Sequence, residues 1–96
     1  MQIKVTQAHI DSGEHCEANA CPVALAVKDV LPEVQSVSVD NFIRLTAADG
    51  TFIDFMLPEV VDAFVVAFDD YGPKRVQPFT FTLPIEERVG ELGGES

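Results

Sequence analysis

The stretch "VQSVSVDNFIRLTAADGTFIDFML", residues 34–57, decides the fold. Val34–Asp40 alternates valine with polar residues, which is the two-residue period of a strand with one covered face. Phe42–Leu57 is typical of a hairpin, because Asp49 and Gly50 tolerate the positive φ angles that a tight turn requires. We therefore expect three consecutive strands, and the short hairpin connection makes their pairing antiparallel.

The register of the hairpin determines which of its side chains are covered. With Asp49 and Gly50 as the two turn residues, both faces carry large apolar side chains. One face has Phe42, Ile53 and Phe55, and the other has Ile43, Leu45, Phe52 and Met56. A small sheet with two apolar faces needs helices on both sides or a second subunit.

Two helices are expected to flank these strands. Pro22–Leu31 contains good helix formers, and proline at the first helical position makes Cys21 the cap residue. Pro58–Gly72 has helical apolar spacing, with Pro58 able to start the helix and Gly72 able to end it. Its expected core stripe consists of Val60, Val61, Phe64, Phe68 and Tyr71.

The remaining segments complete a single α+β domain over residues 1–85. Ile3–Gln7 and Val76–Leu83 alternate as strands, and Pro78 places the latter at a sheet edge. Asp11–Ala20 is small and polar, which predicts a loop. The expected order is β-α-β-β-β-α-β, a mainly antiparallel sheet packed by two helices, followed by an acidic flexible tail over residues 86–96.

The charge of the chain restricts its partners. Six lysines and arginines against sixteen acidic residues give a net charge of −10. Such a surface repels phosphate, which argues against direct nucleic-acid binding, and it attracts basic proteins. The sequence shows neither a signal peptide nor a membrane-spanning stretch, so we expect a cytoplasmic protein with reduced cysteines and no membrane association.

Both histidines and both cysteines of the chain lie between residues 9 and 21. His9, His15, Cys16 and Cys21 are zinc-ligand types, but their spacing within one loop is unlike the paired knuckles of structural zinc sites. The helix dipole would favour a reactive Cys21 thiolate, whereas Glu14 and Glu17 oppose it. We favour a simpler interpretation in which Cys21 is a small buried cap, and a Cys16–Cys21 disulfide remains an alternative.

Several charged residues are candidates for binding. Asp69 and Asp70 lie at the end of the second helix, where the dipole disfavours each by about 0.3–1 kcal/mol. Either Lys74 and Arg75 offset that cost, or these acids join Asp62 in a patch for a basic protein.

Asp54 is a further candidate, because it lies between two apolar residues of the hairpin. It is expected to be buried with a raised pKa, to lie at the rim of the covered face, or to pair with Arg44 or Arg75.

Three stretches together resemble a family of small uncharacterised bacteriophage and prophage proteins. They are "VTQAHIDSG" leading through Cys16 to "CPVALA", then "FMLPEVVDAFVVAFDDYG", and finally "VQPFTFTLP". The resemblance implies a phage accessory protein, a class that often blunts host defence, as anti-CRISPR inhibitors do. It implies no catalytic residue.

Three functional hypotheses follow from these features. The first is a non-enzymatic, homo-oligomeric protein without a cofactor, which uses Asp62, Asp69 and Asp70 to occupy a basic surface of a host-defence complex that handles nucleic acid. The second is an oligomer that sequesters a small molecule such as a nucleotide. Its pocket between subunits would be lined by Arg44, Lys74 and Arg75. The third is a small zinc or thiol protein centred on Cys16 and Cys21.

Overall fold

The computed structural model describes residues 1–14 and 16–88, except for the side chain of Glu87. It has an α+β fold, as predicted, with two antiparallel sheets and three α-helices in this range. The elements are β1 (Gln2–Val5), α1 (Gln7–Ser12), α2 (Pro22–Val30), β2 (Ser36–Val39), β3 (Phe42–Thr46), β4 (Phe52–Met56), α3 (Glu59–Tyr71), the 3₁₀ turn η1 (Pro73–Arg75), β5 (Phe79–Thr82) and the 3₁₀ turn η2 (Ile85–Glu87).

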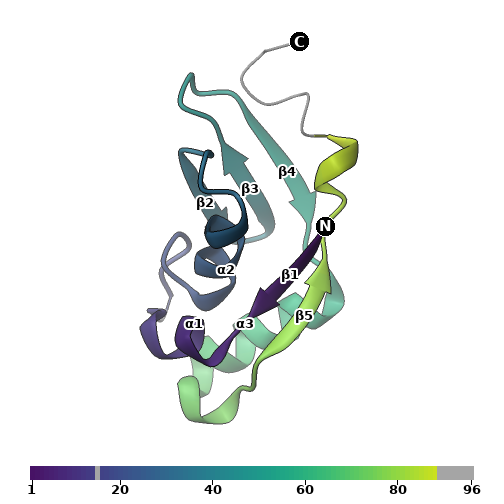
Figure 1. Ribbon diagram of the computed structural model, residues 1–96. Helices are drawn as coiled ribbons and strands as arrows, with labels where there is room; N and C mark the ends of the chain where they lie inside the picture. Colours follow the sequence, from purple (N-terminus) through teal and green to yellow (C-terminus); the bar gives the residue numbers. More distant parts are fainter. Residues whose placement is uncertain (15, 89–96) are drawn as a thin grey trace.

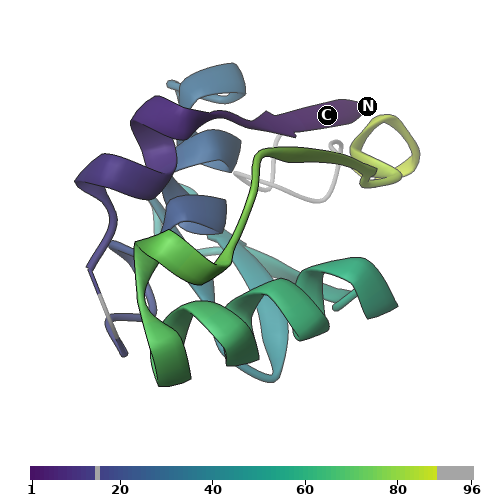
Figure 2. The ribbon, with the colours of Figure 1, turned by 90° about the horizontal axis from the view of Figure 1, so that it is seen from below.

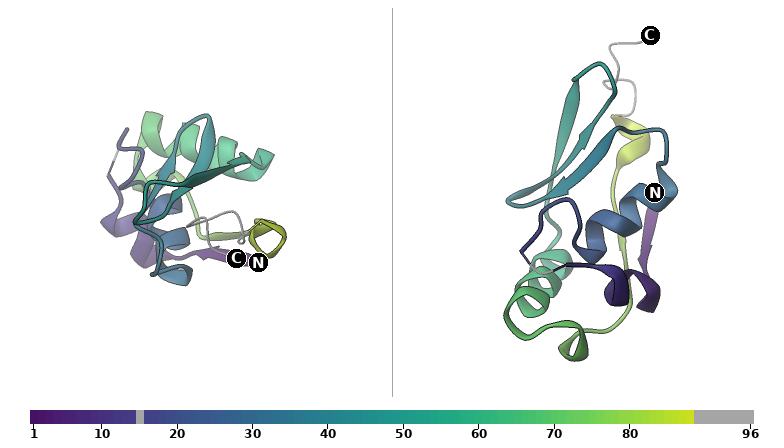
Figure 3. Two further views of the ribbon diagram at one scale, coloured as in Figure 1. Left: turned by 90° about the horizontal axis from the view of Figure 1, so that it is seen from above. Right: turned by 90° about the vertical axis from the view of Figure 1, so that its left-hand side faces the viewer.

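The two sheets share one core. β1 pairs with β5, and β2, β3 and β4 form the second sheet in that order. Helix α2 contacts both sheets, through β1 and β2, and lies beside them in Figures 1 and 3. Helix α3 lies across the molecule in Figure 2 and packs on β5, where the rings of Phe64 and Phe79 have centroids 4.7 Å apart.

The predicted register of the hairpin is wrong by one residue. Phe42 pairs with Met56 and Thr46 with Phe52, so that residues 47–51 form the connection. The connection is longer than a two-residue turn because Ala47 N–H donates to the Thr51 carbonyl at 2.8 Å and closes the ladder before Asp49. A shift of one residue exchanges the two faces of one strand relative to the other.

The corrected register gives the sheet one covered face and one bare face. The covered face carries Ile43, Leu45, Ile53 and Phe55, all at most 4% exposed. The opposite face carries Phe42, Phe52 and Met56, which are 50%, 51% and 81% exposed. Phe42 therefore does not share a face with Ile53 and Phe55, as the two-residue turn predicted.

The ends of the two long helices agree with the prediction. Cys21 is the extended cap residue before Pro22, and α3 begins after Pro58 and ends at Gly72, whose φ of 89° requires glycine. Gly13 allows α1 to approach α2, because a Cβ there would lie 2.5 Å from the Pro22 Cδ.

The stripe that α3 buries is narrower than predicted. Val61, Phe64 and Phe68 are buried, whereas Val60 and Tyr71 are exposed. The small core covers only one row of side chains, and residues at the two ends of the helix lie beyond it. The prediction was therefore wrong for Val60 and Tyr71.

The sequence analysis missed α1. Residues 3–7 were expected to be a strand, but β1 ends at Val5, and Asp11 and Ser12 belong to a helix rather than a loop. The helix is short and buries only Ile10. So short an apolar pattern carries little periodicity, and the helix is stabilised by its cap.

The last described residues contact the domain. Ile85 is buried, the Glu86 carboxylate accepts a hydrogen bond from the Met1 ammonium at 2.8 Å, and Arg88 donates to the Asp54 carbonyl. Glu86 and Arg88 belong to the segment predicted as a tail. Residues 89–96 of that segment lie outside the described residues. Among the described residues, no helix is long and apolar enough to cross a membrane.

Candidate functional site

Two neighbouring hollows lie on either side of Asp40, in the turn between β2 and β3. The larger, of about 400 Å³, is lined by Asp40, Asn41, Phe42, Met56, Leu57, Glu59 and Asp62. The smaller, of about 190 Å³, is lined by Cys16, Glu17, Ala18, Cys21, Val39, Asp40, Val65 and Asp69. Since both hollows share Asp40, their carboxylates form one continuous feature. We call this feature the acidic ridge: Glu17, Asp40, Glu59, Asp62 and Asp69.

The side chains that line the two hollows carry an excess of negative charge, although Asp40 also lines a third hollow together with Arg44. Both hollows lack a lysine or arginine among their lining residues. Glu59 and Asp62 lie in the first turn of α3, where the helix dipole stabilises negative charge. Asp40, Glu59 and Asp62 are exposed, so their carboxylates remain hydrated and available to a cation.

Asp69 has a structural partner as well as a place on the ridge. Its Oδ1 accepts a hydrogen bond from the backbone N–H of Cys16 at 3.0 Å. Cys16 has a φ of 58°, a conformation that non-glycine residues rarely adopt, and this contact joins its loop to α3. The hydrogen bond offsets the cost of an aspartate near the C-terminus of a helix.

The predicted group of Asp62, Asp69 and Asp70 is only partly brought together. Asp62 and Asp69 line adjacent hollows, whereas Asp70 is exposed and lines neither. Within residues 1–14 and 16–88, neither Asp69 nor Asp70 forms an ion pair with Lys74 or Arg75.

The two cysteines line the same hollow but differ in environment. Cys21 is 4% exposed, and burial raises the pKa of its thiol, with the charge of Asp69 acting in the same direction. The backbone N–H groups of Val23 and Ala24 act in the opposite direction without cancelling this effect. The Cys21 thiol is therefore protonated at neutral pH, unlike a nucleophilic cysteine at a helix N-terminus. Cys16 is exposed, and both thiols are free.

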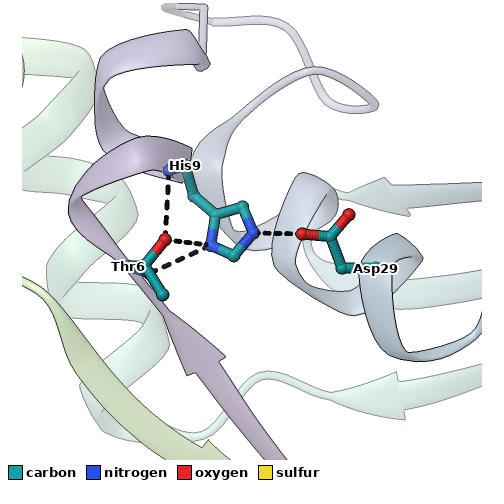
Figure 4. Close-up of polar contacts among 3 residues, drawn as sticks. All are labelled: Thr6, His9 and Asp29. Carbon is teal, nitrogen blue, oxygen red and sulfur yellow. Dashed lines mark hydrogen bonds and ion pairs between the residues drawn. The ribbon is translucent and has the colours of Figure 1, made fainter.

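His9 forms hydrogen bonds with Thr6 and Asp29, as Figure 4 shows. The backbone N–H of Thr6 donates to its Nδ1 at 2.9 Å, which makes Nδ1 the unprotonated nitrogen. Nε2 then carries the proton and donates to the Asp29 carboxylate at 2.5 Å. Thr6 Oγ1 in turn accepts from the backbone N–H of His9, completing a capping box. His9 thus caps α1 and connects it to α2.

Of the candidate zinc ligands, the described chain brings Cys16 and Cys21 to one hollow, but His9 does not join them. His9 has both ring nitrogens occupied and does not line the hollow of Cys16 and Cys21. His15 lies outside the described residues. Among the residues that the structure describes, no group of three or more histidine, cysteine or acidic side chains is arranged to hold a metal ion.

Arg44 and Asp54 form a two-point ion pair on the bare face of the sheet. Arg44 donates from Nε to Oδ1 at 2.7 Å and from Nη2 to Oδ2 at 3.0 Å, and its guanidinium lies 3.9 Å from the centroid of the Phe52 ring. The hydrogen bonds from Arg44 lower the pKa of Asp54. The predicted pairing with Arg44 is confirmed, and the alternative of a raised pKa is wrong.

The three cations proposed for a ligand pocket are separated within one chain. Arg44 lies in β3, in the upper part of Figure 1, whereas Lys74 and Arg75 lie in η1, at the lower end of the view. The Arg75 guanidinium lies 5.4 Å from the centroid of the Tyr71 ring. A pocket lined by all three would require more than one subunit.

Comparisons of this chain with protein-family models, with characterised proteins and with solved structures find no match. Support for the acidic ridge as a candidate site therefore comes from the geometry of this chain alone. Glu17, Asp40 and Glu59 were not predicted as its members, because they are distant in sequence and only the fold places them around two adjoining hollows.

Proposed function

We propose that this chain is a non-enzymatic binding protein whose acidic ridge engages a basic surface of another protein. The observation that carries the proposal is the continuous ridge of five carboxylates around two hollows that lack a lining cation. A field of one sign focused over a concave surface attracts a partner of opposite charge and increases its rate of association.

The hollows also offer apolar contacts. Phe42, Met56 and Leu57 line the larger hollow beside the acids, and Val65 lines the smaller. A lysine or arginine side chain has an apolar stem and a charged end, so it fits a surface that combines both features. This combination supports a protein partner rather than a free metal ion.

In this proposal, the side chains that could take part in catalysis, those of His9 and Cys21, have structural roles. His9 caps a helix, and the protonated Cys21 is buried at the start of α2. Binding without catalysis is therefore the simplest role for the chain.

The partner that we propose is a host-defence complex that handles nucleic acid, with the chain acting in the host cytoplasm. Such a complex has a basic groove for phosphates, and carboxylates on a small domain can occupy it. The resemblance to phage accessory proteins supports this assignment. The protein itself would bind no nucleic acid, because its own charge repels phosphate.

The test is a DNA-cleavage assay with purified CRISPR effector complexes of several types, each incubated with the protein before DNA is added. We expect inhibition of at least one complex, with an inhibitory concentration that rises with ionic strength because the contacts are electrostatic. The double variant Asp40→Lys/Asp62→Lys should weaken inhibition by at least tenfold.

The matched control is Asp11→Lys/Glu33→Lys, which changes the net charge equally at exposed acids away from the ridge. It should inhibit nearly as well as the original protein. An equal loss of inhibition in both double variants would show that only the total charge of the protein matters, and the ridge proposal would be wrong. Absence of inhibition of every complex would remove the proposed partner class.

A further inference from the structure

The bare face of the three-stranded sheet is a second surface, distinct from the acidic ridge in its charge. On β3 and β4 it carries the exposed side chains of Phe42, Arg44, Phe52 and Met56 and the partly exposed side chain of Asp54, and we call these five residues the sheet face. The adjoining positions of β2 on this face are Ser36 and Ser38. The Arg44 guanidinium lies over the Phe52 ring, yet Phe42, Phe52 and Met56 are all at least 50% exposed, and clustered exposure of this kind marks an interaction site.

The sheet face is electrically neutral on a strongly acidic protein. Its charged side chains are Arg44 and Asp54, which neutralise each other, whereas the whole chain carries −10. A basic partner gains little from a neutral surface. Two copies of this chain repel each other wherever their acids meet, and contact through this face places the Arg44–Asp54 pairs at its centre, with Asp40 at its border.

The arrangement of the ion pair also suits a two-fold axis. Arg44 is directly opposite Asp54 at the middle of the β3–β4 ladder, with Phe42 and Met56 at one end and Phe52 at the other. A two-fold axis through this pair would set Arg44 of one copy over Asp54 of the other. Such an interface is self-complementary in charge, as isologous dimers require.

We propose that the sheet face is the interface between two copies of this chain, which stack face to face. Strands of about five residues at about 3.3 Å each, in three rows about 4.8 Å apart, give a face of roughly 250 Å². A standard interface buries about 800 Å² of accessible surface per partner, so a face of this small extent supports only a weak dimer. Sheets stacked in this way lie about 10 Å apart with interdigitating side chains.

The test is sedimentation equilibrium between about 10 µM and 1 mM, at low and high salt. We expect a concentration-dependent monomer–dimer equilibrium that strengthens with salt, because salt screens the repulsion between two acidic chains. The Phe52→Ser variant should weaken dimerisation by about tenfold or more, since it removes a large apolar side chain from the interface. The control is Val66→Ser on α3, because Val66 is exposed to the same extent, 52% against 51% for Phe52.

The charge pair provides a second, independent test. Arg44→Asp places two acids on each face and should abolish the dimer. The double variant Arg44→Asp/Asp54→Arg restores the ion pair with its charges exchanged, and it should therefore restore the dimer. Circular dichroism checks that each variant is folded. If Phe52→Ser does not fold, the charge variants alone test whether the sheet face forms the dimer interface. A monomer at 1 mM in high salt overturns the proposal, as does a dimer that these changes leave intact. The two surfaces share Phe42 and Met56, but their salt dependences distinguish the two proposals, since the dimer strengthens with salt and binding at the ridge weakens.

Discussion

Asp69 and Asp70 are adjacent acids at the end of α3 for which the structure predicts different effects on stability. Both lie where the helix dipole disfavours negative charge. Only Asp69 accepts a hydrogen bond from the Cys16 N–H, at 3.0 Å. We therefore compare Asp69→Ala with Asp70→Ala, because the helix environment is nearly the same at the two positions.

The expected magnitudes follow from this comparison. Replacing either aspartate by alanine removes an unfavourable dipole interaction of about 0.3–1 kcal/mol and gains about 0.5 kcal/mol in helix propensity. Asp70→Ala should thus stabilise the protein. Asp69→Ala also loses a hydrogen bond to a charged acceptor, which for this exposed pair we take as about 1–1.5 kcal/mol. The dipole and propensity contributions cancel in the difference between the two variants.

The assay is thermal unfolding followed by circular dichroism at pH 7. A difference of about 1–1.5 kcal/mol in a domain of this size corresponds to a Tm for Asp69→Ala roughly 5–10 °C below that of Asp70→Ala. Amide hydrogen exchange at Cys16 should also accelerate in Asp69→Ala alone. Equal Tm changes in the two variants, with unchanged exchange at Cys16, would refute the reasoning.

Three further predictions concern the core, the thiols and the ion pairs. Phe68→Ala should destabilise the protein by about 3–5 kcal/mol in urea unfolding, because Phe68 is 1% exposed, whereas Val66→Ala at an exposed site should change stability by less than about 0.5 kcal/mol. Iodoacetamide should modify Cys16 in the folded protein and Cys21 only after unfolding, as mass spectrometry of timed samples would show; fast modification of Cys21 would contradict its burial and raised pKa. Arg44 lowers the pKa of Asp54, and the N-terminal ammonium lowers the pKa of Glu86. These two ion pairs therefore stabilise the folded protein above a pH of about 4, and this contribution is lost as the pH falls through the lowered pKa values. In Arg44→Ala, carboxyl NMR titration should show the pKa of Asp54 rising toward about 3.9, and an unchanged value would contradict the pairing.

The helix ends could be predicted from the sequence because each depends on one residue type. Pro22 fits the first position of a helix, and Gly72 has the positive φ that glycine adopts most easily. These local preferences need no knowledge of the rest of the chain. The alternation in β2 and β5 was recognisable for the same reason.

The hairpin register could not be predicted in this way, because it depends on the length of the connection. The Asp49-Gly50 pair occurs in the turn, but Thr51 N–H and its hydroxyl bond to the Asp49 side chain and make the connection longer. One added residue decides whether Phe42 is exposed or covered. The sheet face therefore became recognisable only in three dimensions.

The negative charge of the candidate site could be predicted from the sequence, but most of the residues that form it could not. The excess of acids indicated a basic partner, and the structure places two of the predicted acids, Asp62 and Asp69, beside adjoining hollows. Asp40 connects the two hollows only because the β2–β3 turn lies beside α3. The role of His9 was hidden because capping boxes usually carry glutamate or glutamine at this position.

The most direct test of the central claim is an NMR titration of the isotope-labelled protein with a peptide of alternating lysine and leucine residues. The acidic ridge predicts chemical-shift changes concentrated around Glu17, Asp40, Glu59, Asp62 and Asp69, with an affinity that falls as salt is added. The Asp40→Lys/Asp62→Lys variant should lose this localised response, and Asp11→Lys/Glu33→Lys should keep it. Changes spread evenly over all acidic residues, or centred on Arg44, Phe52 and Asp54 of the sheet face, would contradict the account.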